Sequence, residues 1–157
     1  MPEPIIRTAT QPEAGTLLAV MRRAFGEYRG VLQPESSVFV ETPELIAAKL
    51  AGGGGFLAIE SDQPVGCLIA EEKDGRGYLG RLAVDPALRR QGMARRLMLA
   101  GEGFLRVRGL KIAEVQVRIA LGGNIALFRS LGYRETARRS HSGFTAPTYL
   151  VMEKSLE

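Results

Sequence analysis

The chain has very few residues of the kinds that form disulfides and metal sites. Its 157 residues include one cysteine, Cys67, and one histidine, His141, which lie far apart in the sequence. A single cysteine excludes an intrachain disulfide, and the apolar neighbours of Cys67 predict an inert position in a buried strand. Metal sites bring together several His, Cys, Asp or Glu ligands at short spacings, and no such pattern occurs. We therefore expect no bound metal ion.

Long apolar runs and internal repeats are also absent. No stretch approaches the roughly 20 apolar residues that cross a bilayer. The first residues, Met1 to Pro4, have neither the basic region nor the apolar region of a secretory signal. We expect a soluble, cytoplasmic protein without a membrane partner, and the length suits a single domain over residues 1–157.

Basic charge is concentrated in one part of the chain. The formal net charge is +4 overall, whereas residues 86–112 alone hold seven Lys or Arg and one Glu. Such a local excess favours a small polyanionic ligand over a broad nucleic-acid surface. Few aromatic residues interleave with the basic ones, which argues further against nucleic acid as a partner.

The basic segment contains a loop that leads into a helix. Residues 81–96, RLAVDPALRRQGMARR, form an apolar strand, a proline turn and an Arg- and Gly-rich loop. Apolar residues then recur at helical spacing, which predicts a helix from about Arg90 to Arg108. The first amides of a helix lack carbonyl partners and carry the positive end of its dipole. With small residues at Gly92 and Ala94, this helix start predicts a phosphate-binding site.

Hydrophobic periodicity and capping signals predict the remaining elements. A strand near Ile5 to Thr8 precedes a helix that ends near Gly26, and Thr42-Pro43 begins a second helix. Further strands are predicted at residues 56–60, 65–72, 78–84, 112–117, 133–140 and 148–154, with a short helix at 125–131. The first three of these strands form an antiparallel meander. A helix between two strands requires a parallel crossover, so the sheet should be mixed.

Four consecutive glycines, Gly52 to Gly55, follow the second predicted helix. A glycine run can form a phosphate cradle, but this one lacks the Lys-Ser/Thr pair of a P-loop. We interpret it as a flexible connector.

The loop at residues 89–94, Arg-Arg-Gln-Gly-Met-Ala, resembles the R/Q-x-x-G-x-G/A signature of the GNAT superfamily of N-acetyltransferases. A preceding strand and a following long helix are the context in which that family carries the signature. The resemblance extends over nearly the whole chain. It implies a single α/β (α+β) domain with a mixed, mostly antiparallel sheet of six to seven strands and about four helices. In such a fold a central pair of parallel strands, the first of them bulged, splays apart to admit CoA.

The same resemblance implies that acetyl-CoA is the acetyl donor and that its pyrophosphate binds the loop. Backbone groups of Leu82 and Val84 would pair with the pantetheine amides as an added strand does. The expected cofactor-binding residues are Leu82, Ala83, Val84, Arg89, Arg90, Gln91, Gly92, Met93, Ala94, Arg95, Asn124 and Phe128.

Residues 124–133, NIALFRSLGY, resemble a second family region, N-x-x-A-x-x-L-Y-x-x-x-G-F, with two departures. Aligned on Leu131-Gly132-Tyr133, the family's usual Asn falls on Leu121, and its common Tyr, often assigned as acid to the CoA sulfur, falls on Phe128. Asn124 either contacts the cofactor or caps the helix that it begins. Phe128 cannot donate a proton, so the sulfur leaves as a thiolate or is protonated elsewhere. Tyr133 is a substitute donor if it faces the cleft, and a core residue otherwise.

Acetyl transfer to an amine also requires a group that removes a proton, and a carboxylate near the cleft is the usual one. Glu71 and Glu72 end the strand beside the expected cofactor strand and face opposite sides of the sheet. Either is a candidate catalytic base, and the alternative is that both are solvated charges before a turn. Tyr78 is a further cleft candidate or a packing residue.

The acceptor is not identified by the sequence. Within residues 25–29, Glu27 suits a cationic amine and Arg29 suits an acidic group, so this segment does not indicate which substrate is bound. His141 is a catalytic base or a substrate contact, or else an exposed loop residue. The candidate acceptor-binding residues are Glu27, Tyr28, His141 and Tyr149.

We therefore predict an N-acetyltransferase that moves an acetyl group from acetyl-CoA to a primary amine of a small molecule, a peptide or a protein. Direct attack without an acyl-enzyme is expected because His141 has no identifiable nucleophile partner. The alternative is a non-catalytic acyl-CoA-binding or regulatory module on the same fold, and a nucleic-acid binder is a third hypothesis. Monomer and homodimer both stay open.

Overall fold

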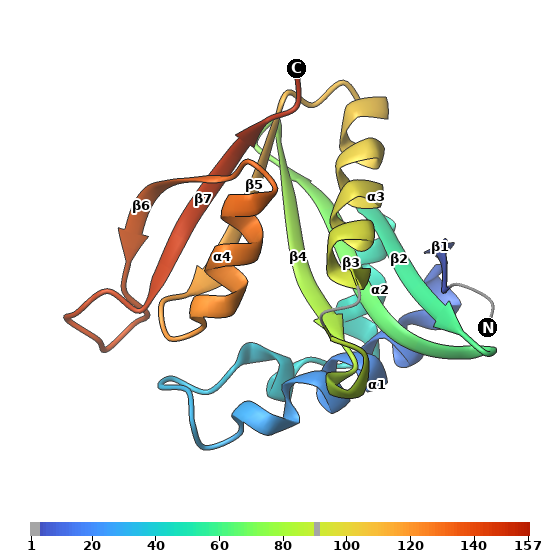
Figure 1. The fold of residues 1–157 in the computed structure, drawn as a ribbon, viewed down its shortest axis with the longest axis horizontal. Coiled ribbons are helices and arrows are strands. Elements are labelled where there is room, and N and C mark those ends of the chain that lie inside the picture. Colours follow the sequence, from blue (N-terminus) through green and yellow to red (C-terminus); the bar gives the residue numbers. More distant parts are fainter. Residues whose placement is uncertain (1–3, 90–91) are drawn as a thin grey trace.

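A single mixed sheet forms the centre of the molecule. A computed structural model describes residues 4–89 and 92–157, and Figure 1 shows its ribbon. Within these ranges seven strands pair in the order β1-β2-β3-β4-β5-β7-β6. Only β4 and β5 run parallel, which confirms the mixed, mostly antiparallel sheet. The strands are β1 (Ile5–Ala9), β2 (Gly53–Glu60), β3 (Gln63–Lys73), β4 (Arg76–Val84), β5 (Ile112–Arg118), β6 (Arg134–Arg139) and β7 (Tyr149–Ser155).

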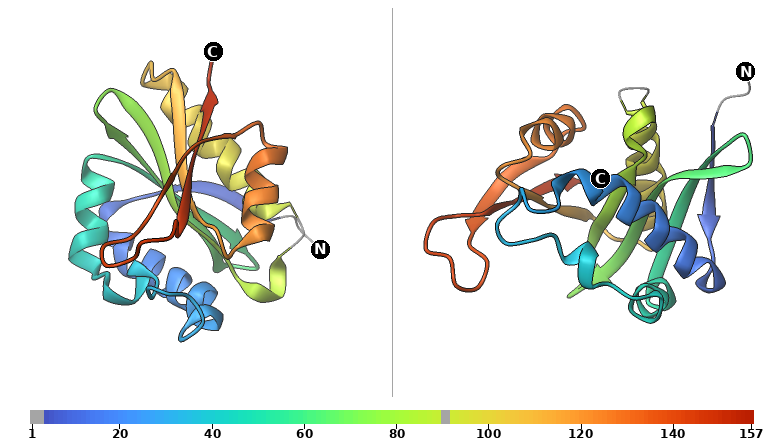
Figure 2. Two further views of the ribbon diagram at one scale, coloured as in Figure 1. Left: turned by 90° about the vertical axis from the view of Figure 1, so that its left-hand side faces the viewer. Right: turned by 90° about the horizontal axis from the view of Figure 1, so that it is seen from below.

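Helices cover both faces of this sheet. In the described part of the chain they are α1 (Ala14–Phe25), α2 (Pro43–Ala51), α3 (Met93–Val107) and α4 (Gly122–Ser130). Helices α1 and α2 pack on one face of β3 and its neighbours, and α3 packs on the other face. Figure 2 shows α4 on the same side as α3. The sheet is therefore the middle of three layers.

Local signals explain where the first helices begin. Thr10 and Glu13 form the predicted capping box ahead of α1, and the side chain of Thr42 accepts a hydrogen bond from the N–H of Leu45 at 3.2 Å. Both arrangements give partners to amides that the first turn of a helix leaves free. The capping patterns in the sequence thus set the helix starts on the α1 and α2 face.

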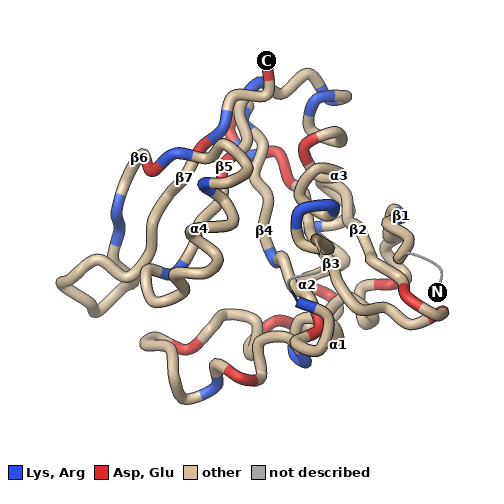
Figure 3. Tube along the Cα trace, in the orientation of Figure 1, with Lys and Arg blue, Asp and Glu red and all other residues tan. Residues whose placement is uncertain are grey.

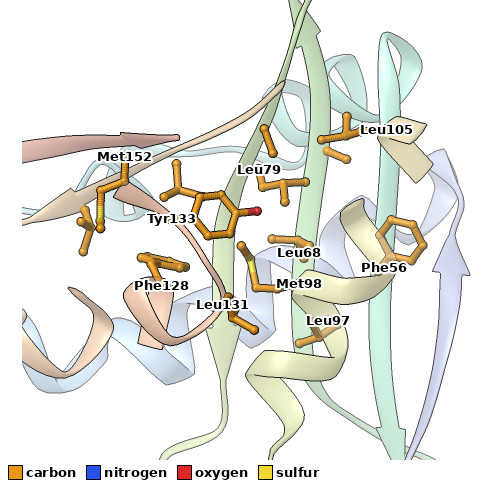
Figure 4. Close-up of a cluster of buried hydrophobic side chains, with 14 of the residues drawn as sticks. Phe56, Leu68, Leu79, Leu97, Met98, Leu105, Phe128, Leu131, Tyr133 and Met152 are labelled. Atoms are coloured by element: carbon orange, nitrogen blue, oxygen red, sulfur yellow. The ribbon is translucent and has the colours of Figure 1, made fainter. Parts of the chain in front are cut away.

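Two apolar clusters fill the space on either side of the sheet. The periodic apolar residues of α3, Leu97, Met98 and Leu105, pack with Leu68 and Leu79 of the sheet (Figure 4). The second cluster lies under α1 and α2 and contains Cys67, which is fully buried. Burial of apolar surface on both faces is the main stabilising contribution to such a layered domain.

The parallel pair β4 and β5 is joined over a short distance. Paired positions are Gly77 with Ala113 and Tyr78 with Glu114. Beyond them the strands diverge, as Figure 1 shows. On its other side β4 carries one residue more than β3 between its pairings with Cys67 and Ile69, and Arg81 within this bulge has φ +58°. A bulge bends its strand and strengthens the local twist, which accounts for the divergence.

The glycine run is not a flexible connector. Gly53, Gly54 and Gly55 belong to β2 and pair with β3, so that interpretation was wrong. A Cβ atom at Gly53 would overlap the carbonyl oxygen of Ala70, and one at Gly54 would lie 2.7 Å from the Phe104 ring. The glycines are therefore sites of close approach between β2, β3 and α3. A run of glycines in a sequence does not by itself distinguish such a strand from a linker.

Gly53→Ala is expected to lower the free energy of unfolding by about 1–3 kcal/mol, because the added methyl group must displace backbone. The matched change Gly52→Ala meets no atom within 4 Å and has an ordinary helical φ of −90°. Its effect should stay within about 0.5 kcal/mol. Urea denaturation of both variants measures the difference, and equal effects would contradict the packing role assigned to Gly53.

Candidate active site

A cleft opens where β4 and β5 separate. It has a volume of about 580 Å³ and is walled by these strands, the end of α1, the start of α3 and α4. Every predicted cofactor-binding residue that the structure describes lines it: Leu82, Ala83, Val84, Arg89, Gly92, Met93, Ala94, Arg95, Asn124 and Phe128. Arg90 and Gln91, also predicted, lie outside the described residues. The fold thus gathers these residues around one cavity.

The start of α3 presents free backbone donors to this cleft. The helix begins at Met93, slightly later than predicted, and Gly92 precedes it with φ +78°, a conformation that suits glycine. The first hydrogen bond along the helix runs from the N–H of Arg96 to the carbonyl of Gly92 at 3.1 Å. The amides of Met93, Ala94 and Arg95 therefore lack intrahelical partners and sit at the positive end of the dipole. Figure 3 shows basic residues at this end of α3.

The exposed edge of β4 continues the cleft. The N–H of Asp85 donates to the carbonyl of Val65 on β3 at 2.8 Å. Since backbone groups alternate sides along a strand, those of Val84 point toward the gap. The Val84 carbonyl accepts from Nε of Arg89 at 3.3 Å, which leaves its N–H for an extended ligand.

Arg89 ties the loop before α3 to the end of α1. Its Nη2 donates to the carbonyl of Ala24 at 2.9 Å, and its Nη1 forms an ion pair with Glu27. This hydrogen bond holds the pKa of Glu27 below its usual range. Glu27, predicted to contact the acceptor, is thus engaged with Arg89, whereas the neighbouring Tyr28 does line the cleft.

A smaller cavity of about 240 Å³ adjoins the cleft. It contains two of the predicted acceptor residues, His141 and Tyr149, whose ring centroids lie 4.9 Å apart. Burial and the charge of Arg118 lower the pKa of His141. Its Nδ1 contacts the Thr148 hydroxyl, which also accepts from the His141 backbone N–H at 2.9 Å and lines neither cavity. The Thr148 hydroxyl therefore stabilises the loop.

Tyr78 lines both cavities. Its ring lies over Gly80, where an added Cβ atom would come within 2.8 Å of ring carbon Cε1 and 3.4 Å of the hydroxyl oxygen. In the sheet register Tyr78 stands between Glu71 on β3 and Glu114 on β5. Burial raises the pKa of Tyr78, and the charges of Glu71 and Glu114 add to this while Arg81 opposes it. The hydroxyl is thus protonated at neutral pH.

The residues predicted to be catalytic lie outside both cavities. Glu71 is near Lys49 of α2, at 3.9 Å, and Glu72 is exposed. Tyr133 is buried, and its hydroxyl donates to Oε2 of Glu102 on α3 at 2.8 Å. Figure 4 shows its ring within the apolar cluster. Tyr133 does not face the cleft because its one polar atom has its partner in the core.

Asn124 does not cap its helix. Helix α4 begins at Gly122 after Leu121, so Asn124 is its third residue and lines the larger cavity. Of its two possible roles, the structure removes the capping role.

Sequence reasoning missed four polar residues of the smaller cavity: Ser37, Arg81, Gln116 and Arg118. A signal existed for two of them, since Gln116 and Arg118 alternate with the buried Val115 and Val117 along β5. Such alternation indicates a strand with one polar face. It does not say which other segments that polar face meets.

In residues 4–89 and 92–157 no group of three or more His, Cys, Asp or Glu residues is placed to hold a metal ion. None of the helices described is both long and apolar enough to cross a membrane.

Comparison with known proteins gives one family and one fold. A family model described as the acetyltransferase (GNAT) family matches residues 18–133. The PaiA N-acetyltransferase of Thermoplasma acidophilum, solved in complex with coenzyme A, superimposes with a TM-score of 0.82 at 16% identity, covering 98% of this chain and 99% of that one. The ribosomal-protein-S18-alanine N-acetyltransferase of Escherichia coli superimposes with a TM-score of 0.78 at 21% identity, covering 98% of this chain and 94% of that one. No curated protein matches the chain.

Cys67 lies behind the β4 bulge and should be chemically silent in the folded protein. Its Sγ donates to the carbonyl of Arg81 at 3.4 Å, and burial raises the pKa of the thiol to about 12. At pH 8 the folded protein should therefore not react with a thiol-specific chromogenic reagent, whereas the urea-unfolded chain should release one equivalent of chromophore. Rapid reaction of the folded protein would show that the bulge opens to solvent.

Proposed function

The chain belongs to the acetyltransferase (GNAT) family, and from this we propose that it transfers the acetyl group of acetyl-CoA to a primary amine. The family uses acetyl-CoA as its acetyl donor. The observation that carries the proposal is the cleft between β4 and β5, which connects the free amides at the start of α3 with the polar cavity around Tyr78. One end suits a phosphorylated donor, and the other end is open to an acceptor.

The residues of the cleft fit the chemical groups of CoA. The amides of Met93, Ala94 and Arg95 are donors for a diphosphate, and Ala94 leaves room for it. The N–H of Val84 is available to a pantetheine carbonyl, as in strand addition. Phe128 supplies an apolar wall. We assign donor binding to these residues and to Leu82, Ala83, Arg89, Gly92 and Asn124.

We propose that the amine attacks the thioester directly. A bond forms between nitrogen and the acetyl carbon, the carbon–sulfur bond breaks, and a proton passes from nitrogen to the sulfur. A covalent acyl-enzyme is disfavoured because Cys67 is fully buried and the Thr148 hydroxyl beside His141 lines neither cavity. Holding the two reactants in one cleft supplies much of the rate enhancement.

Tyr78 is our candidate for moving the proton. Its hydroxyl can accept the proton of the attacking amine while it gives its own to the leaving sulfur, so it stays neutral throughout. Glu71 and Glu114 flank Tyr78 in the sheet but line neither cavity, so they are candidate acceptors, through water, for the proton that an ammonium ion must lose on entry. Glu72 is exposed and Tyr133 is in the core, so we assign them no part.

A non-catalytic acyl-CoA-binding or regulatory module is the second candidate function. It is favoured by Phe128, which stands where the family commonly has a tyrosine that protonates the sulfur, and by the core position of Tyr133. It requires the same donor site but no proton relay.

Titration calorimetry with CoA, followed by thiol release from acetyl-CoA across a panel of amines, tests the function. We expect CoA binding in the micromolar range and turnover with at least one amine. Gly92→Val should raise the Kd for CoA about tenfold or more, because it distorts donors that are each worth about 1.5–3 kcal/mol. Gly103→Ala, in the same helix with open space around it, is the matched control. Absence of CoA binding would refute both functions, and binding without any turnover would favour the module.

Tyr78→Phe is expected to lower kcat about a hundredfold or more with little change in KM for acetyl-CoA, since proton transfer contributes at least this factor. Tyr133→Phe is the matched control, at the tyrosine that the sequence predicted as a substitute proton donor. It should keep kcat but lose about 1–3 kcal/mol of unfolding free energy, because Glu102 loses a buried donor. Steady-state kinetics and denaturation of both variants measure this. A normal kcat in Tyr78→Phe would exclude the relay.

A further inference from the structure

Arg118 occupies a half-buried position at the end of β5. On this strand Glu114, Gln116 and Arg118 alternate with three buried apolar residues and share the face opposite α3. In the sheet register Arg118 lies beside Tyr149 of β7. Arg118 lines the smaller cavity together with Ser37, His141 and Tyr149. This part of the cavity is built from four separate segments of the chain.

Arg118 forms no ion pair within the described part of the protein. Arg76, Arg81 and Arg89 each pair with a carboxylate. Arg118 instead donates from Nη2 to the backbone carbonyl of Glu35 at 3.1 Å, and no described carboxylate lies within ion-pair distance of it. Burial lowers the pKa of Arg118, and the charge of Glu35 opposes this shift without forming an ion pair. A guanidinium has five N–H donors, so most of this fork is available to a ligand.

The smaller cavity therefore has a net positive charge. Its other cation, Arg81, is neutralised by the buried Glu41 through Nε at 3.1 Å. His141 adds no charge at neutral pH, because burial and Arg118 lower its pKa. Among the described residues that line this cavity there is no Asp or Glu. Carboxylates and phosphates are the anions whose geometry matches the N–H fork of a free guanidinium.

The other end of the same face holds two carboxylates. Tyr78 stands between Glu71 and Glu114 in the sheet register, and these carboxylates lie 3.9 Å from Nζ of Lys49 and 3.6 Å from Nη2 of Arg76 respectively. Glu114 and Arg118 are four positions apart on β5, about 13 Å between Cα atoms at the usual strand rise. Arg118 is thus within the span of a small molecule from the proposed reaction centre at Tyr78.

We assign the donor diphosphate and the anion at Arg118 to different parts of the cleft. Arg118 lines both cavities, whereas the residues at the start of α3 that we assign to the diphosphate line only the larger one, and α3 packs on the other face of the sheet. We therefore propose that Arg118 binds a carboxylate of the acceptor, so that the preferred acceptor is a small amine that also carries a carboxylate, an amino acid being the simplest. This inference rests on the proposed function and makes its substrate class specific.

The test compares amino acids with their carboxamides, in which a neutral group replaces the carboxylate. The amino acids differ in the number of carbons between the amine and the carboxylate. Thiol release is measured at saturating acetyl-CoA, and equilibrium binding is measured in the presence of CoA by calorimetry. The variants are Arg118→Gln, Arg118→Lys and, as a matched control, Arg134→Gln at an exposed position of β6. Thermal unfolding and the Kd for CoA of each variant show that it is folded.

We expect at least one free amino acid to exceed its carboxamide about tenfold or more in kcat/KM. Arg118→Gln should remove this preference by raising KM for the carboxylate about tenfold to a hundredfold, the worth of a charge-assisted pair. Arg118→Lys should retain part of it, and Arg134→Gln all of it.

Equal or better use of the carboxamides overturns the inference, as does an Arg118→Gln effect that is the same for both members of a pair. It is also overturned if Arg118→Gln weakens CoA binding and leaves the acceptor unaffected, or if no carboxylate-bearing amine binds. Arg118-dependent binding of amino acids without thiol release would uphold the inference and refute the proposed transferase activity. If Arg118→Gln does not fold, the inference is still tested by Arg118→Lys and by the comparison of amino acids with their carboxamides in the wild-type protein.

Discussion

The candidate site depends on how briefly β4 and β5 pair. Two parallel positions, Gly77 with Ala113 and Tyr78 with Glu114, join them in the described chain. Backbone N–H and C=O groups need partners, and beyond these positions the facing edges have none in the sheet. The bulge at Arg81 directs β4 away from β5, and the resulting gap is both a cavity and a row of backbone donors and acceptors. An extended ligand can take the place of the missing strand contacts.

A sheet divided in this way needs a second connection, and the α3 side supplies it. Glu102 is completely buried and accepts from the Tyr133 hydroxyl at 2.8 Å and from Nζ of Lys154 at 2.9 Å. A buried carboxylate is tolerated only with such partners, and losing one of them is costly. Together with the apolar cluster in Figure 4, this network links α3 to the β6 and β7 side of the molecule. The gap can therefore stay open without separating the two halves.

Much of the fold follows from local patterns, and the exceptions have a common cause. Capping residues and apolar spacing predicted α1, α2, α3 and the meander within a few residues, because these signals act within one or two turns of chain. The glycine run was misjudged because Gly53 and Gly54 are required by Ala70 and Phe104, which are distant in sequence. Tyr133 was ambiguous for the same reason, since its position depends on a carboxylate of α3.

The sequence by itself determined the residues of the proposed donor half of the site. A strand, a loop and a helix start are contiguous in the chain, so residues 82–95 place amides, small residues and an edge strand together without help from elsewhere. Only the tertiary structure decided the proposed acceptor half. It joins Ser37, Tyr78, Arg118, His141 and Tyr149 from segments far apart, and in the described chain it pairs Arg81 and Arg89 with carboxylates but gives Arg118 no ion pair. Which charges are neutralised depends on through-space distance, and one sequence does not contain that distance explicitly.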